Sequence, residues 1–274
     1  MASSSPKAAT AEESYERGLA RAAAGALLFS FPLLMTMEMW AFGAHMDRLR
    51  LGLFTAVIAA IVLGLARFAG FRQTLTFADD ALDALAALLV GFLVAGGLLV
   101  VLGLLTPDMP PREWIGMVTV QAAPASIGAV LANKQLQAKA PRGDDADGAG
   151  YLGQLFLMAS GALFIAFNVA PTEEMILIGF KMSPWHGLVL ILVSLLILHT
   201  LVYSVGFAGQ RAHEGHLLAF LHYTLAGYGI ALLVSLYILW TFGRLDAGLS
   251  EAVRSTIVLG FPAAIGAAAA RLVI

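Results

Sequence analysis

The sequence contains no cysteine, which excludes disulfide bonds, thiolate metal sites and a cysteine nucleophile. Charged residues are also scarce, at 12% of 274 residues, against about 25% in ordinary soluble proteins. The net charge of −2 argues against a nucleic-acid partner, which requires a basic face. What is abundant is apolar: 59% of the residues are hydrophobic and the mean hydropathy is +0.84. A soluble globular protein is therefore excluded, and the chain is predicted to lie in a lipid bilayer.

Eight apolar segments are long enough to cross a membrane, because a helix needs about 20 apolar residues to span the hydrocarbon. They cover residues 20–44, 51–71, 80–106, 113–133, 152–180, 184–207, 216–242 and 251–272. All are predicted to be helical, since lipid offers no partner to an unpaired backbone amide. The expected fold class is an all-α polytopic membrane protein with eight transmembrane helices.

Lysine and arginine predict the orientation. With a cytoplasmic N-terminus, ten of these 16 residues fall inside and six outside, which favours cytoplasmic N- and C-termini. Residues 1–19 lack the features of a signal peptide and are predicted to be a polar cytoplasmic tail, mostly disordered and helical from near Glu12. Residues 134–150 are rich in charge, glycine and proline, which predicts a flexible cytoplasmic linker.

The two halves of the chain resemble each other. Residues 25–46 and 161–182 match at nine of 22 positions at a shift of 136, against about two expected from a composition rich in Ala, Leu and Gly. The sequence PASIGA at 124–129 recurs as PAAIGA at 262–267, shifted by 138. Small residues in these two segments allow helices to approach closely, so we expect the last spans of the two halves to meet each other or to line a tight seam.

This pattern predicts a tandem duplication, with four-helix repeats at residues 20–133 and 151–274. Four spans return the chain to its starting side, so both repeats have the same orientation. The expected architecture is two parallel four-helix repeats about a pseudo-two-fold axis along the membrane normal. Such an axis places equivalent residues opposite each other, where a central pathway is expected.

Glu38 and Glu174 are equivalent residues with apolar neighbours on both sides, so both are expected within the hydrocarbon, toward the outer leaflet. An intramembrane carboxylate is costly unless it is paired, hydrated or protonated, and it suggests a functional site. Pro32 and Pro171 predict kinked or broken helices nearby. The predicted ion or proton pathway consists of Glu38, Glu174, Thr36, Thr172, Glu173 and Asn168. The structural alternative is an interhelical hydrogen bond, or a Glu173/Glu174 pair in the outer headgroup layer.

Three further residues, His199, His222 and Gln121, are secondary candidates. The histidines are expected to face the bundle as hydrogen-bonding groups, with a lesser chance of handling protons. Gln121, like Asn168, is more typical of an interhelical hydrogen bond than of a ligand. Neither these histidines nor His213 and His216, which fall in a predicted cytoplasmic loop, have the HExxH spacing of a metal site. No metal and no cofactor are therefore assigned.

Asp79, Asp80 and Asp83 open the third span. Carboxylates at this place cap helix amides and complement the helix dipole. Capping is the favoured interpretation, and a cytoplasmic cation vestibule is the alternative.

The segment FPLLMTMEMW, preceded by ERGLARAAAGALLFS, resembles a bacterial family of integral membrane proteins, and the similarity extends over the whole chain. The resemblance implies a bacterial inner-membrane protein of this architecture. It brings with it no activity, substrate or site residue.

The sequence therefore favours a membrane transporter or channel for a small cation or protons, lined by Glu38 and Glu174. The alternative is a non-transporting scaffold or assembly factor, in which these carboxylates hold the two halves together. An enzyme is not expected, since the nucleotide-binding and nucleophile motifs are absent from the sequence. Association of two copies stays open.

Overall fold

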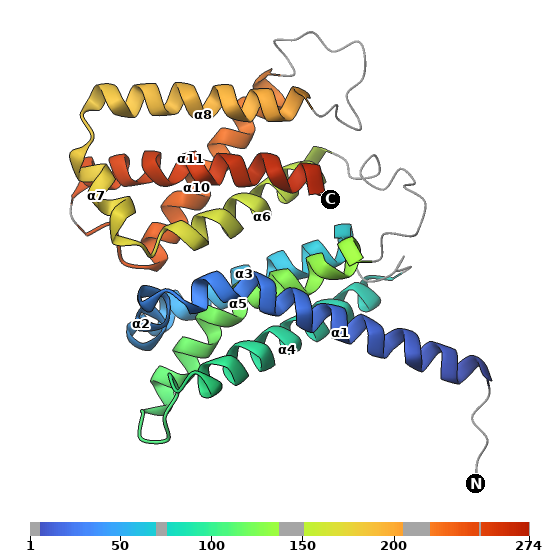
Figure 1. The fold of residues 1–274 in the computed structure, drawn as a ribbon. Helices are drawn as coiled ribbons and strands as arrows, with labels where there is room; N and C mark the ends of the chain where they lie inside the picture. Colours follow the sequence, from blue (N-terminus) through green and yellow to red (C-terminus); the bar gives the residue numbers. More distant parts are fainter. Residues whose placement is uncertain (1–5, 70–75, 137–150, 205–219, 247, 274) are drawn as a thin grey trace. The chain divides into compact units, whose positions relative to one another are not determined.

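The part of the chain described by the computed structural model consists of residues 6–69, 76–136, 151–204, 220–246 and 248–273. Throughout these ranges the regular structure is helical (Figure 1). The chain divides into two compact units, Met1–Ala140 and Pro141–Ile274, which we call unit 1 and unit 2.

Unit 1 is built around its last helix. Its elements are α1 (Pro6–Leu34), α2 (Met37–His45), α3 (Arg48–Ala69), α4 (Phe77–Val101) and α5 (Pro111–Leu136). The last of these, α5, packs against each of the other four, and all its residues from 119 to 130 are buried. Half of that stretch is alanine, serine or glycine, which lets the neighbouring helices come close.

The crossing of α1 and α5 is the closest-packed place in unit 1. A Cβ atom on Gly128 would collide with the carbonyl oxygen of Gly25, and one on Gly25 would collide with the carbonyl oxygen of Gly128. Packing of this kind, through small residues, holds membrane helices together where lipid removes the hydrophobic driving force. The PASIGA segment thus forms a tight seam, but within its own unit.

Unit 2 has the same order of elements. They are α6 (Tyr151–Val169), α7 (Glu173–Lys181), α8 (Pro184–Ser204), the π-helical turn η1 (Phe220–Leu225), α10 (Ala226–Thr241) and α11 (Leu249–Val273). Its last helix, α11, packs against α6, α7, α8 and α10. A Cβ atom on Gly266 would collide with the carbonyl oxygen of Gly161, so PAAIGA also forms a seam inside its own unit.

The protein is an all-helical multi-pass membrane protein. Within the described ranges, seven helices are long and apolar enough to cross a membrane, or eight if the bent pair α1–α2 is one span. The side chains of Leu82, Leu85, Leu89 and Leu93 recur on one side of α4 and are 60–66% exposed. An exposed leucine stripe of this kind is suited to lipid rather than to water.

Two expected spans are broken. Segment 20–44 is not one continuous helix, because the chain turns by 90° between α1 and α2. The expected span 152–180 likewise divides into α6 and α7. Breaks were expected near Pro32 and Pro171, and both are present close to these residues. The N-terminal tail also differs from expectation, since α1 already begins at Pro6 rather than near Glu12.

Candidate functional site

The breaks before α2 and α7 have the same local structure. Thr36 and Thr172 are the N-cap residues of the two short helices. The Thr36 hydroxyl donates a hydrogen bond to the Leu33 carbonyl at 2.7 Å, and the Thr172 hydroxyl donates to the Val169 carbonyl at 2.8 Å. Each hydroxyl oxygen keeps lone pairs that can accept a proton or ligate a cation.

Glu38 and Glu174 lie in the first turns of α2 and α7. They therefore belong to the short helices that follow the two breaks. Glu38 is half-buried and Glu174 is exposed. Considering the described residues alone, neither carboxylate forms a hydrogen bond or an ion pair. An acidic residue in a first turn is favoured by the helix dipole.

Glu173, which was expected beside Glu174 in the pathway, forms an ion pair within unit 2. Its Oε1 atom accepts from the Arg244 guanidinium at 2.8 Å, and the same guanidinium nitrogen donates to the Pro171 carbonyl at 2.9 Å. Arg244 follows α10 in the chain and is 18% exposed, whereas Glu173 is 68% exposed. The interaction ties the start of α7 to the end of α10, and the exposure of Glu173 makes its energy small.

The two candidate amides have different partners. Gln121 is fully buried on α5, and its amide nitrogen donates to the Leu33 carbonyl on α1 at 3.3 Å. Its Oε1 atom is buried with no hydrogen-bond partner among the described residues. The Asn168 amide donates to the Phe164 carbonyl of its own helix at 2.7 Å, and it forms no hydrogen bond to another helix among the described residues.

The histidines lie at the other end of α8. His199 Nδ1 is 2.9 Å from the Thr224 hydroxyl oxygen, which links α8 to η1. The His222 side chain is exposed, and its backbone carbonyl accepts from the Tyr151 hydroxyl at 3.0 Å. His213 and His216 lie outside the described residues. In the ranges that the structure describes, no group of three or more His, Cys, Asp or Glu residues could hold a metal ion.

Two of the aspartates at the start of α4 have partners within unit 1. Thr76 is the N-cap, and its hydroxyl accepts from the Asp79 amide at 3.3 Å. Asp80 is 2% exposed and pairs with Arg67 of α3 at 3.0 Å. Capping was the favoured interpretation, but the partner of Asp80 was missed because it lies on another span.

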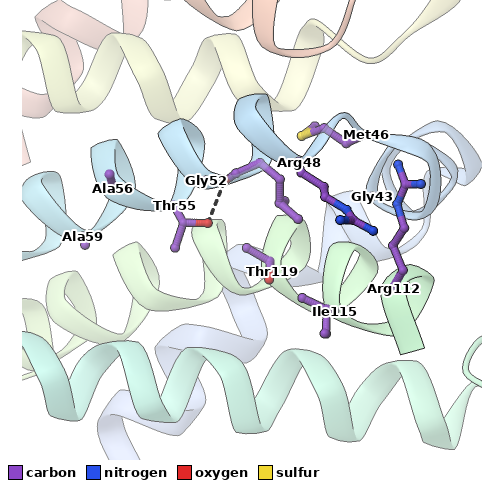
Figure 2. Close-up of a pocket in the computed structure, with 11 residues that line it drawn as sticks. Gly43, Met46, Arg48, Gly52, Thr55, Ala56, Ala59, Arg112, Ile115 and Thr119 are labelled. Carbon is purple, nitrogen blue, oxygen red and sulfur yellow. Dashed lines mark hydrogen bonds between the residues drawn. The ribbon is translucent and has the colours of Figure 1, made fainter. Parts of the chain in front are cut away.

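A groove in unit 1 was also missed. It has a volume of about 810 Å³ and lies between α3 and α5, with α2 at one end (Figure 2). Two arginines, Arg48 and Arg112, lie at the α2 end, and the other lining residues are apolar or small. Glu38 and Thr36 are not among its lining residues. The sequence signal was the spacing of Gly52, Ala56 and Ala59, by four and three residues, on one side of a helix.

The model of the family described as "Putative integral membrane protein (DUF2391)" matches residues 18–274. The chain belongs to this integral membrane family. The match begins within α1 and includes both units. No curated protein and no solved structure matches the chain.

Proposed function

We propose that this multi-pass membrane protein moves a small cation or protons across the bacterial inner membrane, with Glu38 and Glu174 binding the transported species. The observation that carries the proposal is the equivalence of the two carboxylates. Each follows a break in a helix, lies in the first turn of the short helix after it, and is preceded by a threonine bonded to the carbonyl three residues earlier.

The chemistry around Glu38 suits a hard cation or a proton. Small hard cations prefer carboxylate, hydroxyl and carbonyl oxygens, and Glu38, Thr36 and Gln121 supply one of each. The Leu33 carbonyl accepts from both Thr36 and Gln121, which brings these two side chains to the same helix break. The buried Gln121 Oε1 atom leaves one acceptor there for a cation or a proton donor, since a buried polar atom without a partner is costly.

The architecture supports a parallel duplication. In each unit the last helix packs against the first helix through glycines and against the short helix after the break. Two units of this kind, each with four spans, give both the same orientation in the membrane. We propose that they are related by a pseudo-two-fold axis along the membrane normal, with both termini in the cytoplasm. The transported ion would be the only small partner, with no enzymatic step, no cofactor and no nucleic acid.

Flux into liposomes tests the proposal. The purified protein is reconstituted, and K⁺, Na⁺ and proton fluxes are measured with ion-sensitive dyes. Flux above that of empty liposomes is expected for the parent, and a loss of at least tenfold for Glu38→Gln combined with Glu174→Gln. The matched control is Glu113→Gln with Glu251→Gln, which removes two carboxylates from the first turns of α5 and α11 and should leave flux unchanged.

The same variants decide the alternative of a scaffold or assembly factor. In that case the parent carries no flux, while Glu38→Gln and Glu174→Gln lower the midpoint of thermal unfolding and a partner protein co-purifies. Parental flux in the double variant would also overturn the proposal, since the carboxylates would then take no part in transport.

A further inference from the structure

The groove between α3 and α5 has the shape of a channel for a hydrocarbon chain. Beyond Arg48 and Leu51, its lining residues along α3 are Gly52, Thr55, Ala56 and Ala59, which share one side of the helix (Figure 2). A Cβ atom on Gly52 would meet nothing within 4 Å, so this position is open space. The Thr55 hydroxyl donates to the Leu51 carbonyl at 2.7 Å, which leaves it no free donor to attract water.

The dimensions of the groove also suit such a chain. From Arg48 to Ala59 the helix rises by about 16 Å, at 1.5 Å per residue. A volume of about 810 Å³ lies within the range of about 300–1,000 Å³ that is typical of ligand sites. On the α5 side the groove is lined by Ile115 and Thr119.

The α2 end of the groove is basic. Arg48 is the first residue of α3, Arg112 lies in the first turn of α5, and both side chains are exposed. Neither guanidinium forms an ion pair with any residue that the structure describes. The nearby carboxylate of Asp47 is occupied by the backbone amides of Leu49 and Arg50. Two guanidinium groups without an ion-pair partner among the described residues favour an anion.

We propose that this groove binds one anionic phospholipid, with its phosphate at Arg48 and Arg112 and one acyl chain along Gly52, Ala56 and Ala59. A lipid can bind the basic end and the apolar groove at once, since its charged and apolar parts are joined in one molecule. Guanidinium groups at the end of a spanning helix lie at headgroup level, where they can contact the phosphate of an anionic lipid. A soluble anion would use the two arginines and leave the apolar groove empty.

Unit 2 lacks the counterparts of both the two arginines and the small residues of the groove. At the shift of 136, Gly52 corresponds to Leu188 and Ala56 to Leu192, and at the same shift Arg48 corresponds to Pro184. The counterpart of Arg112 at the shift of 138 is Ser250. The larger side chains and the loss of both charges restrict the proposed lipid site to unit 1.

Lipid binding in nanodiscs tests the headgroup half of the site. The probe is labelled phosphatidylglycerol, with phosphatidylcholine as the zwitterionic comparison, and bound lipid is counted by native mass spectrometry. Arg48→Gln with Arg112→Gln should weaken phosphatidylglycerol binding at least tenfold. Arg50→Gln, a neighbouring arginine that does not line the groove, should leave it unchanged. Equal binding of the two lipids by the parent would overturn the proposal.

Gly52→Leu tests the chain half without touching the charges. The variant has leucine, the residue found at the corresponding position 188 of unit 2. Since a Cβ atom there meets nothing within 4 Å, the fold should be kept. Circular dichroism and the midpoint of thermal unfolding check this. Phosphatidylglycerol binding should fall at least tenfold. Glycerol 3-phosphate, the headgroup alone, should not compete at millimolar concentration. Unchanged lipid binding in this variant, or effective competition by glycerol 3-phosphate, would show a soluble-anion site and overturn the proposal.

Discussion

Units 1 and 2 share the order of their helices and differ in how their short helices are packed. In unit 1 the backbone of α2 comes so close to α5 that a Cβ atom on Gly116 would collide with the Gly43 carbonyl. In unit 2 a Cβ atom on Gly179 would lie 3.2 Å from the Ser255 hydroxyl, so a side chain separates α7 from α11. Close glycine packing between the first and last helices is therefore common to both units. The packing of the short helix against the last helix differs between them.

The arginines near the short helices also differ between the two units. In unit 2, Arg244 holds the Pro171 carbonyl and Arg254 donates to the Met182 carbonyl at 3.1 Å. Both therefore bind the backbone around α7. In unit 1, Arg48 and Arg112 bind no such carbonyl within the described ranges, and they line an open groove instead. The two arginines near the short helix of unit 2 thus have backbone partners, whereas the two at the α2 end of the groove in unit 1 have none among the described residues.

The largest effect is expected at the seam that the units share. Gly128→Ala and Gly266→Ala each place a methyl group against a backbone carbonyl, so the helices must move apart. Each should lower the free energy of unfolding by about 3 kcal/mol, the upper part of the usual range for overpacking. The measurement is reversible unfolding in mixed detergent micelles.

The control for these variants is Gly97→Ala on α4, where a Cβ atom meets nothing within 4 Å. It should be neutral or slightly stabilising, because alanine favours the helix. A difference of more than about 2 kcal/mol between the two seam variants would break the comparison, since that exceeds the spread expected for one kind of overpacking.

A smaller effect separates the units at their short helices. Gly43→Ala brings a methyl group to 2.7 Å from the Cα atom of Met117, whereas Gly179→Ala brings one to 3.2 Å from a serine hydroxyl that can rotate. We expect a loss of about 2 kcal/mol for the first and less than about 1 kcal/mol for the second. Unfolding of the two variants under identical conditions measures the difference. Equal losses would mean that α7 is seated as rigidly as α2.

Much of the architecture was predictable because apolar length and small-residue motifs are local properties of the sequence. The all-helical membrane fold was predicted from them and is confirmed, as are the breaks near Pro32 and Pro171. The 90° turn was not predicted, since apolarity is the same on both sides of Leu34. The helix of the tail was also missed, because its polar composition is compatible with either state.

The candidate site was less predictable because it depends on contacts between distant segments. The partner of Glu173 is 71 residues away in sequence, and that of Gln121 is 88 residues away. No periodicity indicates such pairs. The equivalence of Glu38 and Glu174 was visible only because the two halves could be aligned, and their role in transport stays a prediction.

The smallest expected effect on stability concerns the N-terminal caps of α3 and α8, the helices that follow α2 and α7. Asp47 caps α3 in unit 1, and in unit 2 the hydroxyl of Ser183 accepts from the His186 amide at 3.5 Å. Hydrogen bonds from the backbone amides of Arg50 and Leu49 lower the pKa of the Asp47 carboxyl below its ordinary value of 3.8. A lowered pKa in the folded state means that the ionised carboxylate stabilises the fold above the ordinary value, and that this is lost as the pH falls through the lowered one.

Asp47→Asn keeps an acceptor at the cap and removes its ionisation. The parent should therefore be more stable than this variant by a constant amount above about pH 5, and the difference should shrink as the pH falls below 3.8. A hydrogen bond with the Thr106 side chain also lowers the pKa of the Asp108 carboxyl, but Asp108 is present in both proteins, so its contribution cancels in the comparison. Ser183→Ala is the matched variant of unit 2, and its cost should not change over that range because a hydroxyl does not ionise there. A difference between the parent and Asp47→Asn that is constant down to pH 2 would show that the charge of Asp47 contributes nothing to the cap.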